Sequence, residues 1–182
     1  VPNMQAGFEE VQAAGKILEP SVCFSTGPEH TNDFYVKKVQ EILAVTGDEI
    51  VLCIKNHGGL GSPKRIGDLV DAILQKYPEM VIHYHGHNTD GNDIGRIVAA
   101  AMAGAKIVDA SDHAFTGYYG PPPILTVVQT LKEYGRPAVG LDLGSRRALG
   151  PLPAAGRCRV SAPLPAGAGS ELLSGNLLQL LK

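Results

Sequence analysis

Three histidines alternate along one apolar segment, in the stretch VIHYHGHN that holds His83, His85 and His87. Side chains of a β-strand have a period of two, so the three imidazoles are expected on the same face. His85 and His87 close this predicted strand, where two neighbouring imidazoles could bind one zinc, cobalt or manganese ion. Hydrogen bonding within a core is the alternative for each histidine, but the alternation of all three favours a metal.

Lys55 closes the preceding apolar run, in the segment VLCIK, at the equivalent carboxyl-end position. A buried lysine is costly unless it is paired or chemically modified. As an ammonium it carries only donors and cannot bind a metal, whereas carbamylation by carbon dioxide would give it an anionic oxygen. The residues alone favour an ordinary ion pair, with Asp109 as the candidate partner, over carbamylation.

These side chains need a scaffold that brings strand ends together, and the apolar pattern predicts one. Four apolar runs indicate buried strands at residues 21–24, 49–54, 80–85 and 106–110. Each run is followed by a turn and a helical pattern, with a repeat of about 25 to 30 residues.

The clearest predicted helix begins after Ser62, which can cap it, with Pro63 at the first helical position. Apolar residues then recur at spacings of three and four, at Ile66, Leu69, Val70, Ile73, Leu74 and Tyr77. Similar patterns predict helices after Thr31, after Asn92 and over residues 124–134.

Four consecutive strand–helix units predict an α/β fold with a parallel sheet and right-handed crossovers. The sheet could be an open doubly wound sheet or part of an eight-unit barrel, and periodicity does not separate the two. In both architectures ligands bind at the carboxyl ends of the strands. The chemistry is therefore expected where Lys55, His85 and His87 lie.

Composition excludes several classes of function. The 182 residues are 44% hydrophobic, and 16 basic against 18 acidic residues give a net charge of −2, which disfavours nucleic acid or an anionic membrane as a partner. No apolar stretch approaches the roughly 20 residues of a membrane span, and no signal peptide is recognisable. Three cysteines form no disulfide framework, so a reducing, cytoplasmic location is predicted.

The character of the chain changes near residue 143. Residues 1–143 contain eleven basic and seventeen acidic residues, whereas residues 144–182 contain five basic residues and only Glu171 as an acid. The second segment is rich in Ala, Gly, Pro and Arg and poor in large apolar residues, as is typical of a tail. Its paired leucines predict a short helix over residues 171–181.

Four segments together resemble successive motifs of biotin-dependent carboxyltransferase domains. These domains occur in pyruvate carboxylase, the oxaloacetate decarboxylase α subunit and the transcarboxylase 5S subunit. The resemblance is collinear over essentially residues 1–143, since the strand and helix preceding these motifs also match. The segments are EIVLCIKNHGGLGSP (49–63), VIHYHGHNTDGND (81–93), AGAKIVDASDHAFTG (103–117) and GLDL (140–143).

The resemblance implies a metal-dependent (β/α)8 TIM barrel, of which this chain would be the second half. It implies that Lys55 is carbamylated and that His85 and His87 are metal ligands, whereas His83 is a buried histidine that does not bind that metal. It also implies carboxyl transfer between carboxybiotin and a keto acid of the pyruvate or oxaloacetate type. The cofactors would be a divalent metal (Zn, Co or Mn) and biotin, carried by a biotin carboxyl carrier domain.

The chain is therefore expected to act as part of a longer protein and to be inactive as an isolated fragment. The unpaired edges of a half barrel predict self-association, most simply as a homo-oligomer. One alternative is a non-catalytic barrel remnant or interaction fragment. The other is a related metal-dependent aldolase or lyase of the same superfamily, against which the lysine at the strand end argues.

Overall fold

The computed structural model describes residues 2–113, 116, 119–139 and 177–180. Within these residues one sheet has the order β1-β2-β3-β4-β5, and its first four strands run parallel. The predicted series of parallel strand–helix units is therefore confirmed. The strands are β1 (Ser21–Cys23), β2 (Val51–Asn56), β3 (Val81–Gly86), β4 (Ile107–Ser111) and β5 (Leu177–Leu180).

Helices alternate with the parallel strands as predicted. A short 3-10 turn η1 (Pro2–Met4) leads into α1 (Gln5–Ala13), and the later helices are α2 (Asn32–Thr46), α3 (Pro63–Lys76), α4 (Asp93–Ala103) and α5 (Ile124–Glu133).

Local sequence explains where the two longest helices begin. The Ser62 hydroxyl accepts a hydrogen bond from the Arg65 amide at 3.1 Å, and Thr31 caps α2 through the Phe34 amide at 3.2 Å. No helix in the described ranges is both long and apolar enough to cross a membrane.

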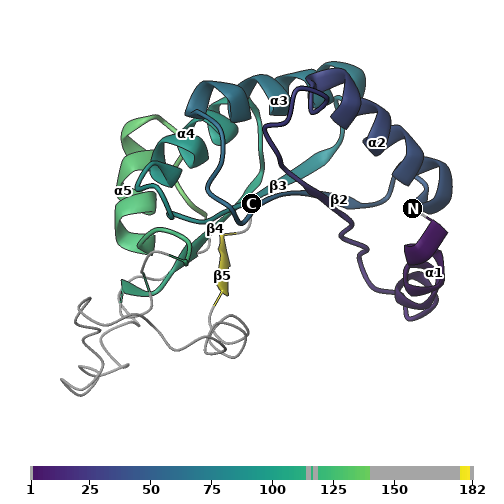
Figure 1. Cartoon of the computed structure of the whole chain (residues 1–182). Coiled ribbons are helices and arrows are strands. Elements are labelled where there is room, and N and C mark those ends of the chain that lie inside the picture. The colour runs from purple at the N-terminus through teal and green to yellow at the C-terminus, as the bar shows by residue number, and fades with distance from the viewer. Residues whose placement is uncertain (1, 114–115, 117–118, 140–176, 181–182) are drawn as a thin grey trace, which may run out of the picture.

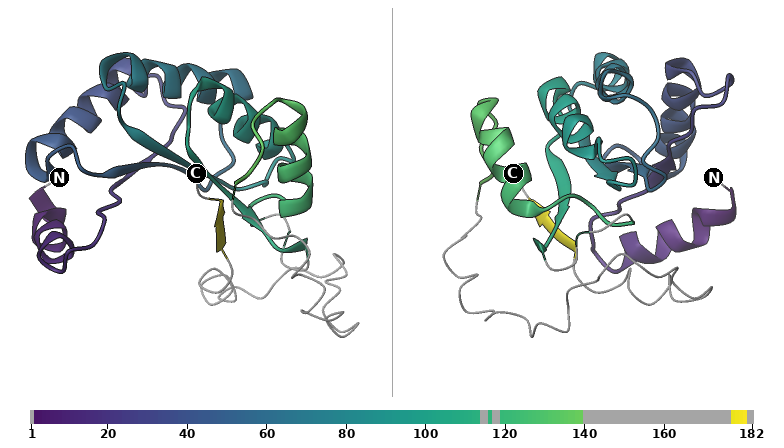
Figure 2. Two further views of the ribbon diagram at one scale, coloured as in Figure 1. Left: turned by 180° about the vertical axis from the view of Figure 1, so that it is seen from behind. Right: turned by 60° about the vertical axis from the view of Figure 1, so that its left-hand side comes forward.

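The helices α2 to α5 cover the outer, convex side of a curved sheet (Figure 1 and Figure 2). Alternate residues of the central strands point into the helices and are fully or almost fully buried. Each buried aliphatic side chain contributes about 1.5–3 kcal/mol to stability. We call this surface the helix-covered face; its residues include Leu52, Ile54, Ile82, Tyr84, Val108 and Ala110.

The intervening residues of the same strands are mostly polar and form the inner face, which holds Cys53, Lys55, His83, His85 and Asp109. The parallel register aligns them in rows across the sheet. Ser21, Cys53 and His83 form one row, and Cys23, Lys55 and His85 form the next row toward the carboxyl ends. The sheet therefore places the predicted site residues on one surface.

Residues 177–180 correct one prediction, because they form strand β5 rather than part of a helix. This strand pairs antiparallel with β4, with Asp109 opposite Gln179 and Ser111 opposite Leu177. Leucine is compatible with both conformations. The edge of β4 offers backbone groups that an added strand can hydrogen-bond with, whereas a helix cannot. The rest of the predicted tail, residues 144–176 and 181–182, lies outside the described residues.

Candidate functional site

The end of β3 brings two imidazoles into direct contact. His85 Nε2 lies 3.1 Å from His87 Nε2, and both side chains are buried. Behind them, His85 Nδ1 lies 2.6 Å from Asp109 Oδ2 on β4. An ionised carboxylate only accepts hydrogen bonds, so His85 donates from Nδ1 to Asp109 and directs Nε2 toward His87.

The surroundings of His87 favour its neutral form, which is the form of histidine that binds a metal. Burial and the nearby charges of His85, His57 and Lys55 lower the pKa of His87 to about 4, so its imidazole is neutral at pH 7. Burial alone would raise the pKa of Asp109, but hydrogen bonds from His83 and His85 hold it below its usual value. A neutral imidazole, here His87, beside an imidazole backed by a carboxylate, here His85 with Asp109, is a common arrangement in metal sites.

Lys55 lies beside this pair but differs from the prediction in two ways. Its side chain is exposed rather than buried, and no ion pair joins it to Asp109. The sheet order explains this difference. Because β3 lies between β2 and β4, His83 and His85 contact Asp109 and Lys55 does not. Lys55 instead lines a hollow of about 380 Å³ together with Glu19, Ser21, Cys53, His83, His85 and Asp109.

His83 is buried one row below His85, as the resemblance implied. Its Nδ1 lies 2.5 Å from Glu19 Oε1, and its Nε2 lies 3.0 Å from Asp109 Oδ2. Burial alone would lower the pKa of His83, but the Asp109 carboxylate and the Cys53 sulfur raise it to about 11. Asp109 thus contacts two histidines of the same strand through one oxygen.

A buried polar network on the helix-covered side fixes the loops around the site. Asn56 Nδ2 donates to the Leu60 carbonyl at 2.9 Å and to Tyr84 Oη at 3.2 Å. Tyr84 in turn donates to Asp93 Oδ1 at 2.8 Å. Burial raises the pKa of Asp93 to about 6, although the Tyr84 hydrogen bond opposes the shift.

Arg96 ties the same network to the loop after β2, which runs past the site. It donates to the Gly59 carbonyl at 2.8 Å and the Gly61 carbonyl at 2.7 Å, and it pairs with Asp90. These bonds hold the ends of β2 and β3 in a fixed relation, which positions Lys55 and His85.

Sequence reasoning did not single out Glu19 and Cys53 as site residues. Cys53 shares the inner face with Lys55 because the two residues lie two positions apart along β2. Glu19 precedes β1, and only the pairing of β1 with β2 brings it to His83. The period-two rule could have found Cys53, but no local signal marks Glu19.

Comparison with known proteins assigns this scaffold. The HMGL-like family model matches residues 5–147. The chain belongs to the HMGL-like family. A pyruvate carboxylase of Aspergillus terreus is 30% identical over 137 residues, which cover 72% of this HMGL-like chain and 11% of the relative. Mitochondrial pyruvate carboxylase of Rattus norvegicus is 28% identical over 138 residues, which cover 72% of the chain and 12% of that protein.

Solved structures give the same result for the fold. The carboxyl transferase domain of Rhizobium etli pyruvate carboxylase with pyruvate and biocytin matches with a TM-score of 0.72 and 25% identity. The match covers 81% of this chain and 25% of that one. The complete multifunctional Rhizobium etli enzyme matches with a TM-score of 0.70 and 25% identity, over 78% of this chain and 14% of that one.

These matches confirm the predicted resemblance and the predicted architecture. The four parallel strands and their helices correspond to part of the TIM barrel of the pyruvate carboxylase carboxyltransferase domain. The HMGL-like chain spans only about a tenth of the length of its curated relatives.

Proposed function

We propose that this chain provides one part of a metal-dependent carboxyltransferase site, which moves a carboxyl group between carboxybiotin and a keto acid of the pyruvate or oxaloacetate type. The observation that carries the proposal is the pair of imidazoles at the end of β3, with Nε2 atoms 3.1 Å apart and Asp109 behind His85. Lys55, the proposed catalytic residue, lies opposite His85 in the register of β2 and β3.

The donor set fits a divalent cation of the zinc, cobalt or manganese type. Bonds from imidazole nitrogen to such ions measure about 2.0–2.1 Å, so two nitrogens at the observed separation can share one ion. His87 is uncharged at neutral pH, and Asp109 orients His85 through its other nitrogen. When bound, the ion would supply Lewis-acid stabilisation of the negative charge that develops on the keto oxygen.

Lys55 would add an oxygen ligand to the two histidines after carbamylation. Its neutral amine would attack carbon dioxide, form a nitrogen–carbon bond and release one proton to solvent, which gives an anionic carbamate. Exposure of the side chain to the hollow supports this proposal, because carbon dioxide can reach the amine. The absence of an ion pair to Asp109 also leaves the amine available.

The proposed partners follow from the same comparison. The Rhizobium etli domain was solved with pyruvate and biocytin, a keto acid and a biotin derivative. We extend this chemistry to the present chain, with a biotin carboxyl carrier domain as the partner and a keto acid as the substrate. Self-association and a cytoplasmic location stay predictions.

The test replaces Lys55 by arginine in the full-length protein that carries this chain. Arginine keeps the positive charge and pairs well with carboxylates, but it cannot form the carbamate. We expect Lys55→Arg to abolish oxaloacetate decarboxylation and biotin-dependent carboxyl transfer, assayed with bicarbonate supplied. The matched control is Lys64→Arg, an exposed residue on α3 that pairs with Asp68 and should leave turnover unchanged. Near-normal turnover of Lys55→Arg would refute the carbamate.

A metal-dependent lyase is the second candidate, because the whole matched region belongs to the HMGL-like family. Such an enzyme could use the same histidine pair without biotin. Avidin, which sequesters biotin, separates the two functions: it should inhibit a carboxyltransferase and leave a lyase active. A full-length protein inactive in both assays would instead support the non-catalytic alternative.

A further inference from the structure

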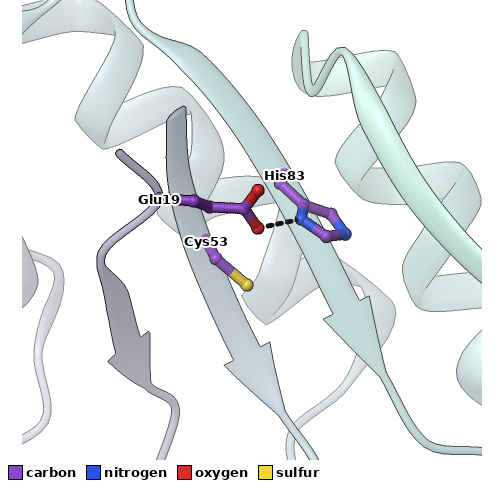
Figure 3. Close-up of side chains that lie close together, drawn as sticks. All are labelled: Glu19, Cys53 and His83. Carbon is purple, nitrogen blue, oxygen red and sulfur yellow. Dashed lines mark hydrogen bonds and ion pairs between the residues drawn. The ribbon is translucent and has the colours of Figure 1, made fainter. Parts of the chain in front are cut away.

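A second set of metal-ligating side chains lies on the inner face, nearer the amino ends of the strands. Glu19 precedes β1, Cys53 lies on β2 and His83 on β3, and one ligand atom from each lies within 4.8 Å of the others. Figure 3 shows the three side chains converging on one point between the strands. In the described part of the chain, this is the one group of three such residues that meets this spacing.

This set is separate from the histidine pair at the end of β3, although both sets contact Asp109. His83 turns Nε2 toward Asp109 Oδ2, which leaves Nδ1 directed at Glu19. His85 turns the opposite nitrogen, Nδ1, toward the same oxygen, which leaves Nε2 directed at His87. Asp109 thus contacts two imidazoles, whose other nitrogens face two different groups of ligands.

We propose that Glu19, Cys53 and His83 bind one thiophilic divalent cation of the zinc or cobalt class. A thiolate, an imidazole and a carboxylate are the donors that zinc uses, whereas magnesium and calcium prefer oxygen donors alone. Cys53 binds as a thiolate and His83 binds through a deprotonated Nδ1, so binding releases one proton from each side chain to water. The carboxylate behind His83 corresponds to the contact that orients metal-bound histidines in many proteins.

Burial and access also suit an ion at this position. Cys53 and His83 are 5% and 3% exposed, so the two strongest ligands are held rigidly by the sheet. The Glu19 side chain is 33% exposed and borders the hollow, which gives the ion a path from solvent. Three protein ligands leave a fourth position for a water molecule.

The test looks for sulfur beside the metal. The chain contains three cysteines, so Cys158→Ser is introduced into every form and only Cys23 and Cys53 remain. The full chain is loaded with zinc, and X-ray absorption measures the distances to its ligands. We expect one sulfur at about 2.3 Å. Cys53→Ser should remove this signal, whereas Cys23→Ser, the matched control on the neighbouring strand, should retain it.

Two further variants make the result specific. The sulfur signal should persist when His85 and His87 are both replaced by alanine. The proposed site at Cys53 can therefore be confirmed even if the carboxyltransferase function is refuted. Glu19→Gln, at a partly exposed position that tolerates substitution, should weaken zinc binding about tenfold or more, as loss of a ligand requires. A zinc-loaded chain without a sulfur ligand, or a sulfur signal unchanged in Cys53→Ser, would show that Glu19 and His83 form an ion pair only.

Discussion

The two faces of the sheet have different roles. On the helix-covered face, Leu52, Ile54 and Ile82 are completely buried against α2 to α5. On the inner face, residues one step along the same strands are Cys53, Lys55 and His83, and they contact other polar side chains or line a hollow. Alternation with a period of two thus separates what folds the chain from what carries its chemistry.

The difference has an energetic basis. Apolar side chains on the helix-covered face gain stability in proportion to the area they bury. Polar side chains on the inner face lose hydration, and they offset that loss only by pairing, as Asp109 does with His83 and His85. Substitutions on the first face should therefore reduce stability, and those on the second should mainly alter binding.

The largest effect on stability is expected for Ile82→Ala. This side chain is fully buried between the sheet and the helices, so its truncation leaves a cavity. We expect the free energy of unfolding to fall by about 2–5 kcal/mol in urea denaturation. Leu125→Ala is the control, because Leu125 is about half exposed on α5 and should cost far less. Equal losses in the two variants would contradict the proposed division between the faces.

A smaller effect is expected for Asp93→Asn, and it depends on pH. Burial raises the pKa of Asp93 from 3.8 to about 6, so the folded chain keeps a proton that the unfolded chain has lost. The contribution of Asp93 to stability is therefore present below pH 4 and is lost as the pH rises toward and beyond 6. The groups facing it are Tyr84, Arg96, Asp90 and His85.

Unfolding experiments at pH 4 and pH 7 measure this effect. Relative to the wild-type chain, Asp93→Asn should gain up to about 3 kcal/mol between the two values, since its side chain does not ionise. Asp68→Asn, at a surface ion pair, is the control and should show no such gain. An identical pH dependence for wild type and Asp93→Asn would show that folding does not raise the pKa of Asp93.

The smallest effect on stability is expected for Lys55→Gln. Lys55 is exposed, and no ion pair joins it to another described residue. Thermal or urea unfolding should change by no more than about 0.5 kcal/mol, as for other surface substitutions. A loss of several kcal/mol would instead place Lys55 among the residues that hold the fold together.

Much of the scaffold could be predicted from the sequence because its signals are local. The apolar runs marked all four parallel strands, and Ser62 with Pro63 marked the start of α3. The alternation of His83 and His85 was enough to place them on the inner face, and His87, just after β3, lies against His85. These patterns depend on residues close together in the chain.

The side-chain partners could not be predicted, because they depend on strand order and register. The sequence suggested that Lys55 pairs with Asp109, but β3 lies between their strands and its histidines take that carboxylate. Glu19 meets His83 across 64 positions in the chain. Strand β5 was also missed, since its conformation depends on the free edge of β4.

The metal content of the histidine pair decides whether the inner face holds the proposed metal site. The full chain is prepared with Cys53→Ser, to isolate this site, then dialysed with zinc, cobalt or manganese and bicarbonate and analysed for bound metal. We expect about one ion per chain. Adding His85→Ala and His87→Ala should remove it, whereas adding His30→Ala, a histidine before α2, should not. Unchanged metal content after loss of both His85 and His87 would contradict the assignment of this pair as metal ligands.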